Sequence, residues 1–311
     1  MLTGKYVFKS NGEIIAEKEN MLTSNGINMI NKYLAQSISD WAGSIAVGAF
    51  YTSTASTDTS LAYEISRSSV TLKTYRTTSG SNQIVLKASL DPLLYGSIYE
   101  IGVIPQNLTL SDPRNNFYLT KFDDTYGTSS SSDWLIGTTL SSASIRPAFS
   151  ASSRFGLYNL PVPVTGSVAT RSGFGLDISQ FNTGDYLSLL YYVSTAVTGT
   201  PSLTFVLTDS SSNTWTSVTS SINTASALTY YTASFALSNT PGTNFNYSLD
   251  AITASFTGTA TGSVYFDSLK LMSGAALDEM ETLVSRSSSS AALVTTRYGQ
   301  PLEIEYYLTV T

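Results

Sequence analysis

The sequence contains no cysteine and no histidine. Without cysteine the chain can form no disulfide bond and no thiolate metal site, and it has no cysteine nucleophile. Without histidine it lacks the commonest general base, the commonest transition-metal ligand and the Ser-His-Asp arrangement. Carboxylate chemistry remains possible, but without these two residue types we expect the protein not to be an enzyme.

Charge is also scarce. Asp, Glu, Lys and Arg make up 12% of the chain, and the formal net charge is −6, whereas soluble domains carry roughly 25% charged residues. Phosphate binding needs a basic face, and no cluster of Lys and Arg occurs, so we expect no nucleic-acid partner. The apolar runs are far shorter than the roughly 20 residues of a membrane span, which predicts no membrane insertion. The first residues lack the basic-then-apolar pattern of a signal peptide, which predicts synthesis in the cytoplasm without one.

Ser, Thr, Asn, Gly and Tyr take the place of charge, a composition typical of β-structure with polar, uncharged surfaces. The 311 residues suffice for two domains. Glutamate occurs up to Glu100 and again from Glu279, and lysine is absent between Phe122 and Leu269. This division predicts a discontinuous outer domain, residues 1–122 plus 274–311, with an inserted domain at residues 123–273.

The outer domain should be a mixed α+β unit with one clear helix. Thr23 or Ser24 can cap this helix, and Ile27, Ile30 and Leu34 recur at helical spacing, so the helix should run to about Gln36 with that face buried. Alternation and turn signals predict strands at Lys5–Lys9, Ile14–Ala16, Ser44–Ala49, Val70–Tyr75, Gln83–Ser89, Ile98–Ile104 and Leu302–Val310. The last of these should join a sheet of the outer domain.

The inserted domain has the pattern of an antiparallel β-sandwich, so the fold class as a whole should be mainly β. Strand candidates separated by Gly, Ser, Asn and Pro turns are Tyr186–Val193, Leu203–Thr208, Tyr230–Leu237, Leu249–Phe256 and Val264–Leu271.

Several short motifs occur in order along the outer domain: Asn20–Leu34, Ile45–Phe50, Thr57–Arg67, Ile98–Pro105 and Gly299–Val310. This order resembles a family of virion structural and tail-fibre proteins of tailed bacteriophages. The positions that match the family pattern are Gly48, Asp58, Leu61, Glu64, Arg67, Glu100 and Gly102. The chain departs from the pattern after Gly48, where a second glycine is common and Ala49 stands instead. Glu64 and Arg67 are three residues apart, and we expect them to pair on a helical turn.

The inserted domain is similar to the jelly rolls of carbohydrate-binding modules. Its closing strand carries Phe266, Asp267, Leu269 and Leu271, which match the final strand of such modules. Aspartates at this place in similar jelly rolls help to hold a structural calcium ion, so the resemblance makes Asp267 a candidate calcium ligand. The alternative is a hydrogen-bonded aspartate at the edge of a sheet.

Aromatic residues are the main candidates for a function of the inserted domain, because sugar rings pack on aromatic faces. In each of the pairs Tyr191/Tyr192 and Tyr230/Tyr231 the two side chains must point to opposite faces of the sheet, so one member should be core and the other exposed. The predicted glycan-binding residues are Trp134, Tyr192, Trp215 and Tyr231. An exposed aromatic row could equally be a subunit interface.

Taken with the resemblance, these features indicate a surface protein of a phage particle. Its outer domain would contact other virion proteins and its insert would meet a host surface glycan, in a homo-oligomer that we expect to be a trimer. One alternative is a capsid or neck decoration protein without a receptor role. Another is a polysaccharide depolymerase, which would need two carboxylates about 5–10 Å apart across a sugar. Its candidates would be Asp123 and Asp124, or Asp278, Glu279 and Glu281.

Overall fold

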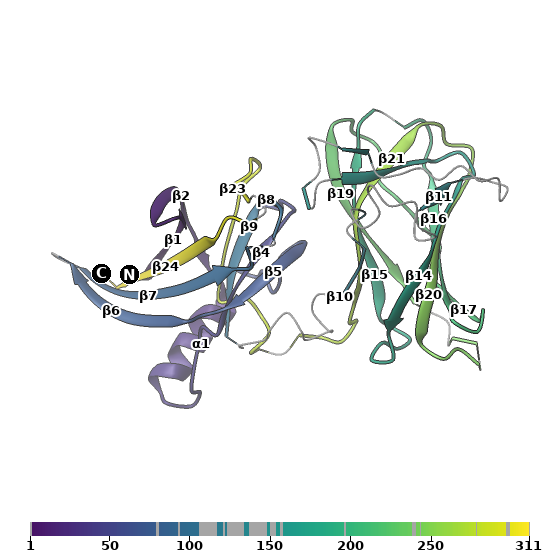
Figure 1. Ribbon diagram of the computed structural model, residues 1–311. Coiled ribbons are helices and arrows are strands. Elements are labelled where there is room, and N and C mark those ends of the chain that lie inside the picture. The colour runs from purple at the N-terminus through teal and green to yellow at the C-terminus, as the bar shows by residue number, and fades with distance from the viewer. Residues whose placement is uncertain are drawn as a thin grey trace. The chain divides into compact units, whose positions relative to one another are not determined.

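The computed structural model describes residues 2–78, 81–92, 94–105, 117–120, 122, 134–136, 148–149, 154–155, 158–195, 197–237, 241–242, 244–277, 279–296 and 299–310 (Figure 1). The chain divides into two compact units: unit 1 is Met1–Asp112 with Ala276–Thr311, and unit 2 is Pro113–Ala275. Composition placed the first junction directly after residue 122. In the structure the junction lies earlier in the chain, because Leu119 and Phe122 already belong to the buried core of unit 2.

The first sheet of unit 1 has the C-terminal strand at its centre. Its antiparallel order is β2 (Glu13–Glu19), β1 (Leu2–Ser10), β24 (Leu302–Val310), β7 (Ser81–Leu90) and β6 (Leu72–Thr78). Strand β24 pairs with β1 from Leu2 opposite Val310 to Ser10 opposite Leu302, and with β7 on its other side. The prediction that the last strand joins a sheet of the outer domain is therefore confirmed, and Figure 1 shows β24 between β1 and β7.

The second sheet of unit 1 combines the N-terminal part of the chain with the returning segment. Its order is β3 (Met21–Leu22), β22 (Ser285–Ser288), β9 (Glu100–Ile104), β4 (Ser44–Gly48) and β5 (Glu64–Ser69), and a separate pair is formed by β8 (Gly96–Ile98) and β23 (Val294–Thr296). Strands β4 and β9 are buried along their whole length. The returning segment thus contributes strands to each of these sheets.

The predicted helix is present as α1 (Ser24–Leu34), and Thr23 caps it by accepting a hydrogen bond from the Gly26 N–H at 2.9 Å. Its buried face was predicted only in part. Ile27 is 49% exposed and Leu34 72% exposed, whereas Gly26, Met29 and Ile30 are buried. The helix contacts the returning segment through Gly26, where a Cβ atom would lie only 1.9 Å from the Val284 carbonyl oxygen. This close approach orients the helix so that Ile27 faces outward.

Glu64 and Arg67 do form a pair, but on strand β5 and not on a helical turn. The guanidinium donates two hydrogen bonds of 2.8 Å to the carboxylate. In a regular strand, residues three apart point to opposite faces. Here the register shifts between Val47 and Gly48, so that Ile65 is an extra residue on β5. A β-bulge of this kind changes the alternation and brings the two side chains to one side.

Unit 2 is an antiparallel β-sandwich, so the predicted mainly-β fold class is confirmed. One sheet has the order β12 (Ala148–Phe149), β13 (Tyr158–Pro163), β21 (Ser263–Met272), β15 (Tyr186–Val193) and β19 (Thr229–Ala236), with β10 (Phe117–Thr120) also on β21. The other has the order β11 (Leu135–Ile136), β14 (Val168–Asp177), β20 (Ser248–Thr257), β16 (Ser202–Asp209) and β17 (Thr214–Thr216), with β18 (Ser220–Ser221) also on β16. The sequence patterns missed β13 and β14, which contain prolines and glycines respectively.

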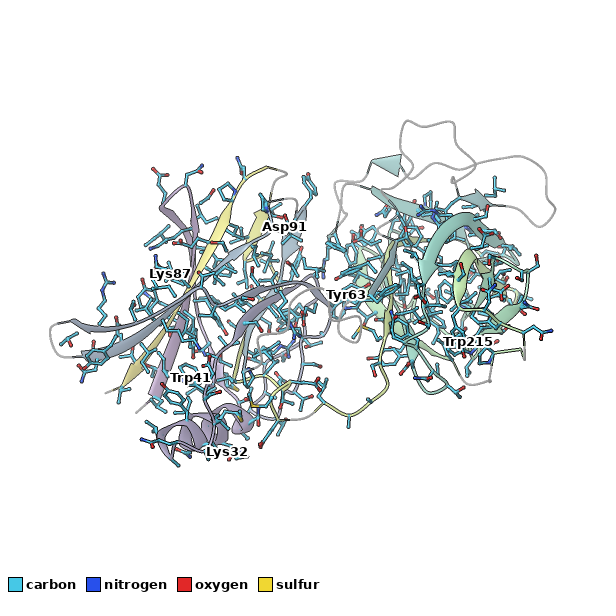
Figure 2. The ribbon with its side chains drawn as sticks, turned by 60° about the horizontal axis from the view of Figure 1, so that its bottom comes forward. Lys32, Trp41, Tyr63, Lys87, Asp91 and Trp215 are labelled. Carbon is cyan, nitrogen blue, oxygen red and sulfur yellow. The ribbon has the colours of Figure 1, made fainter. Side chains whose placement is uncertain are left out.

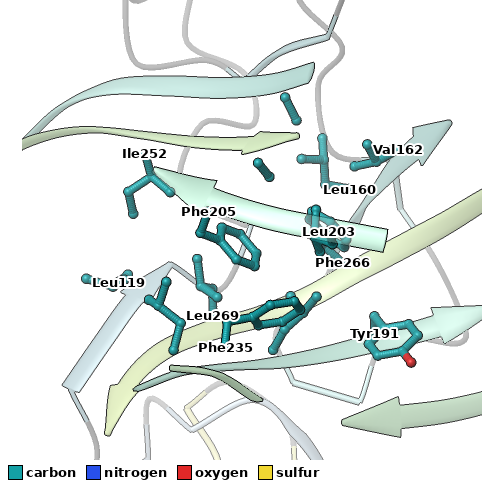
Figure 3. Packing of buried hydrophobic residues seen from close by; sticks show 14 of the residues in the cluster. Leu119, Leu160, Val162, Tyr191, Leu203, Phe205, Phe235, Ile252, Phe266 and Leu269 are labelled. Atoms are coloured by element: carbon teal, nitrogen blue, oxygen red, sulfur yellow. The ribbon is translucent and has the colours of Figure 1, made fainter. Parts of the chain in front are cut away.

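The core of the sandwich lies between these two sheets. Phe205 of β16 meets Phe235 of β19 at 5.0 Å between ring centroids, and Phe256 of β20 meets Phe266 of β21 at 6.0 Å. Figure 3 shows Phe205, Phe235 and Phe266 together with Leu203, Leu269 and Tyr191. Within the described ranges, no helix has the length and apolar character that crossing a membrane requires.

The solvent side of the first sheet carries an ionic network that should make unit 1 sensitive to acid. Glu305 on β24 contacts Lys9 at 2.7 Å and Lys87 at 2.6 Å and accepts a hydrogen bond from the Tyr307 hydroxyl. Burial alone would raise the pKa of Glu305, but the hydrogen bonds from Lys87, Lys9 and Tyr307 outweigh it and lower the pKa to about 2.

Because the folded pKa lies below the ordinary value of 4.5, the stabilisation by Glu305 is complete above that pH and is lost as the pH falls toward 2. We expect Glu305→Gln to flatten the pH dependence of the urea midpoint of unit 1 in this window. The control is Glu303→Gln, a more exposed carboxylate on the same face of β24. Equal acid sensitivity of wild-type protein and Glu305→Gln would contradict the assignment.

Candidate functional site

A row of three tyrosines crosses the outer face of one sheet of unit 2. Tyr192 on β15 lies directly opposite Tyr230 on β19 and directly opposite Tyr265 on β21. The ring centroids are 5.0 Å apart for Tyr192 and Tyr230 and 6.2 Å apart for Tyr192 and Tyr265. Pro161 on β13 is paired with Tyr265 and continues the row on a fourth strand. The outer side chains of four adjacent strands thus form one apolar strip.

The accessible part of this strip is the half-buried pair Tyr192 and Tyr265. Tyr230 is covered, because the Arg154 guanidinium lies 4.3 Å from the centroid of its ring, within the range of a cation–π contact. Burial and then the charge of Asp267 raise the pKa of the Tyr230 hydroxyl. The hydroxyl is therefore neutral at physiological pH, and it is a hydrogen-bond partner of Asp267.

Asp267, the candidate calcium ligand, is fully buried beneath this row. The register of β21 against β15 shifts there, so that Asp267 is an extra residue in a β-bulge. Its carboxylate accepts hydrogen bonds from the backbone N–H groups of Arg154 (2.8 Å) and Phe155 (3.3 Å). In the described part of the chain no group of three or more carboxylates could hold a metal ion. The hydrogen bonds to Asp267 therefore hold the backbone that carries Arg154 in place. Calcium binding by Asp267 stays a prediction.

Two of the predicted glycan-binding residues lie in the core and not on the surface. Trp134 and Trp215 are each only 1% exposed. Trp134 packs against Phe122 at 5.2 Å between ring centroids, and Trp215 packs edge-on against Phe245 at 5.8 Å. Figure 2 labels Trp215 within unit 2. Neither indole face is accessible to a ligand, because the large apolar area of tryptophan fills the interior of the sandwich.

Tyr231 also faces the inside of the sheet, although it is only partly buried. Its ring stacks on Tyr191 at 5.7 Å, and its hydroxyl accepts a hydrogen bond from the Ser226 N–H. The two side chains of each pair do point to opposite faces, but no member is fully exposed, and the outward member of the second pair is the buried Tyr230 and not Tyr231. Tyr265, which the sequence did not single out, completes the row. The sequence did contain a signal for Tyr265: it directly precedes the apolar Phe266 in an alternating strand, so the two side chains must point to opposite faces.

Of the carboxylates considered for a depolymerase, the described ones are Glu279 and Glu281. Glu279 forms an ion pair with Lys32 at 2.5 Å and contacts Asn28. Asp123, Asp124 and Asp278 lie outside the described residues.

The motif residues of the outer domain converge on a buried ion pair in unit 1. The Arg286 guanidinium lies 2.7 Å from a carboxylate oxygen of Glu100 and 2.8 Å from one of Asp58. Glu100 also accepts hydrogen bonds from the backbone N–H groups of Tyr63 (2.8 Å) and Ala62 (2.9 Å). Burial raises the pKa of Glu100, and the charge of Arg286 opposes that rise. Sequence reasoning did not find Arg286, because it is distant along the chain.

Two of the matching glycines make room for this ion pair and its strands. A Cβ atom on Gly48 would lie 2.3 Å from a Glu100 carboxylate oxygen, and one on Gly102 would lie 2.4 Å from a Leu283 methyl carbon. Leu61 is buried in the same region with Leu283. These positions therefore have a structural role, since they fix the loop after β4 and the returning segment to β9.

The chain matches no protein-family model and no curated protein sequence. Among solved structures, it is similar to a xylan-binding module (12% identity, covering 45% of this chain and 89% of that one, TM-score 0.32). It is also similar to a family 11 carbohydrate-binding module of a Clostridium thermocellum cellulase (12%, 51% and 95%, TM-score 0.32). A third similar structure is the enzymatically active domain of tailspike protein 4 of bacteriophage CBA120 (10%, 46% and 20%, TM-score 0.30). At these values function has to be argued from the residues.

Removal of the buried cation should reveal the role of the motif cluster. We expect Arg286→Met to lower the free energy of unfolding of unit 1 by about 3–5 kcal/mol, because Glu100 would remain buried without its counter-charge. Hydrogen exchange of β9 peptides in increasing denaturant measures this energy for unit 1 separately from unit 2. Arg76→Met, on the exposed part of β6, is the matched control and should change it by less than about 0.5 kcal/mol. Equal effects of the two substitutions would contradict a structural role for Arg286.

Proposed function

We propose that this protein is a non-enzymatic structural component of a tailed phage particle that presents a glycan-binding surface to the host. Unit 1 attaches to other virion proteins, and unit 2 binds host surface glycan through Tyr192 and Tyr265, the accessible tyrosines of the row. The protein acts as a homo-oligomer, for which we propose three copies. The observation that carries the proposal is the tyrosine row on the outer face of the sandwich.

The chemistry of the row suits a sugar. A pyranose ring has flat C–H faces that pack on aromatic rings and hydroxyls that need polar partners. Tyr192 and Tyr265 offer both, since each has an apolar ring and a hydroxyl tip. Adjacent strands are about 4.8 Å apart, so the row can contact more than one sugar unit of an extended chain.

A single shallow aromatic strip of this kind binds weakly. Several copies on one particle would raise the overall affinity through effective concentration, without any new contact. This reasoning supports a multivalent attachment protein and favours an oligomer.

The absence of histidine and cysteine supports a role in binding and not in catalysis. The assignment to a phage particle is supported by the resemblance of the outer-domain motifs to virion structural and tail-fibre proteins. Asp58 and Glu100 bind Arg286, and Gly48, Leu61 and Gly102 pack beside this ion pair and its strands, which gives those motifs a common structural purpose in unit 1.

Substitution of the accessible rings tests the glycan site. We expect Tyr192→Ala and Tyr265→Ala each to weaken binding to a responsive glycan about tenfold, because each removes a packing surface worth about 1 kcal/mol or more. Binding is measured on an array of host envelope polysaccharides with purified full-length protein. Tyr51→Ala, at a comparably exposed tyrosine of unit 1, is the control and should bind as the wild type does. Full binding by the Tyr192→Ala, Tyr265→Ala double variant would reject the site.

The place of the protein on the particle requires a separate measurement. We expect antibodies raised against residues 158–272, labelled with gold, to decorate the tail or its fibres on intact phage particles produced from the genome that encodes this chain. Label spread over the head would favour a decoration protein, and particles without label would contradict a surface-exposed unit 2. Release of reducing ends from a bound polysaccharide would contradict the non-enzymatic assignment.

A further inference from the structure

Unit 1 has a groove of its own, between helix α1 and the β6 edge of the first sheet. The groove has a volume of about 350 Å³, within the size range of small-molecule sites, about 300–1,000 Å³. Its floor is formed by Trp41, Ile84 and Leu86. Figure 2 shows Trp41 close to α1. Leu86 is opposite Tyr306 in the sheet, so the groove lies on the core side of that sheet at its open end.

Two tyrosines flank the groove from different elements. Tyr33 comes from the last turn of α1 and is 43% exposed, and Tyr75 comes from the edge strand β6 and is 68% exposed. Tyr75 is paired with Ile84, so its ring rises from the same face of the sheet as the apolar floor. Large aromatic rings usually bury most of their surface in a core or an interface. Here two aromatic rings from separate elements keep much of their surface exposed, and both rings lie beside a concave apolar surface.

The polar groups of the groove are held in place before any ligand arrives. Asp40 accepts a hydrogen bond from the Ala42 N–H at 3.0 Å and forms an ion pair with Lys73 of β6. Lys73 is paired with Leu86, so its ammonium group projects from the face that carries the floor. The side chains of Asp40 and Lys73 are each 36% exposed, and Ser39 also lines the groove. The groove is electrically neutral but rich in donors and acceptors.

From this combination we infer that the groove binds one or two units of an uncharged saccharide. Tyr33 and Tyr75 pack on the C–H faces of the sugar ring, and Asp40 and Lys73 bond its hydroxyls. The ion pair of Asp40 and Lys73 carries no net charge that would favour an anionic or a cationic ligand, whereas a sugar hydroxyl can accept a hydrogen bond from the ammonium and donate one to the carboxylate. The inference goes beyond the proposed glycan site, because it assigns a second saccharide site to the unit that was given only an attachment role.

The test uses full-length protein that carries Tyr192→Ala and Tyr265→Ala, so that the proposed site in unit 2 does not contribute. Cellobiose, maltose and lactose are titrated separately, and ¹⁵N-labelled tryptophan side chains are followed by NMR. Trp41 is the tryptophan of unit 1, whereas Trp134 and Trp215 belong to unit 2. We expect saturable shifts of the Trp41 signal with at least one of the three sugars.

In the same background, Tyr75→Ala and Tyr33→Ala should each weaken this binding about tenfold, because each removes one packing face of the sugar. Asp40→Asn should also weaken it, and Tyr51→Ala should leave it unchanged. Thermal unfolding of each variant shows whether the fold is retained. We expect Tyr75→Ala to retain it, because the side chain of Tyr75 is largely exposed.

Saturable shifts of Trp41 that are lost in Tyr75→Ala support the groove, whatever the outcome at the tyrosine row of unit 2. No saturable shift with any of the three sugars, or shifts equal in Tyr75→Ala and its background, would overturn the inference. Glycan-array binding by the protein with an intact unit 2 would then still stand as evidence for the first site alone.

Discussion

The placement of β24 between β1 and β7 is the constraint on which unit 1 depends. Strand β24 is hydrogen-bonded to β1 on one side and to β7 on the other, so β1 and β7 belong to one sheet only when β24 lies between them. The cost of closing a loop rises only slowly with its length. A whole sandwich can therefore be inserted between β9 and β22 at little additional entropic cost, as long as the returning segment recovers its partners.

The same return places Arg286 beside Glu100. An unpaired carboxylate at a fully buried position would be costly, and the arginine that compensates for it lies on β22, which pairs with β9. Gly48 and Gly102 allow the backbones to approach closely enough for this arrangement. The motif residues of the outer domain thus stabilise the closure of unit 1 around its insertion. They do not themselves form a binding surface.

Local irregularities of the strands direct polar side chains in both units. The bulge at Ile65 brings Glu64 and Arg67 to one side of β5, and the bulge at Asp267 turns a carboxylate toward the backbone that carries Arg154. Arg154 in turn covers Tyr230 and leaves Tyr192 and Tyr265 accessible. The shape of the tyrosine row therefore follows from one extra residue in β21 as well as from alternation.

The sequence by itself determined the elements with strong periodic patterns. Strands such as β15, β16, β20, β21 and β24 alternate clearly, and α1 carries its cap in Thr23. It also determined that Tyr191 and Tyr192 point to opposite faces. Only the tertiary structure decided which face is which, and hence that Trp134 and Trp215 are core, that Tyr265 completes the row, and that Ile27 is exposed. The groove at Trp41 and the Arg286 ion pair likewise escaped sequence reasoning. The physical reason is the same in each case: periodicity is a local property, whereas burial and contact depend on the register of strands that are distant along the chain.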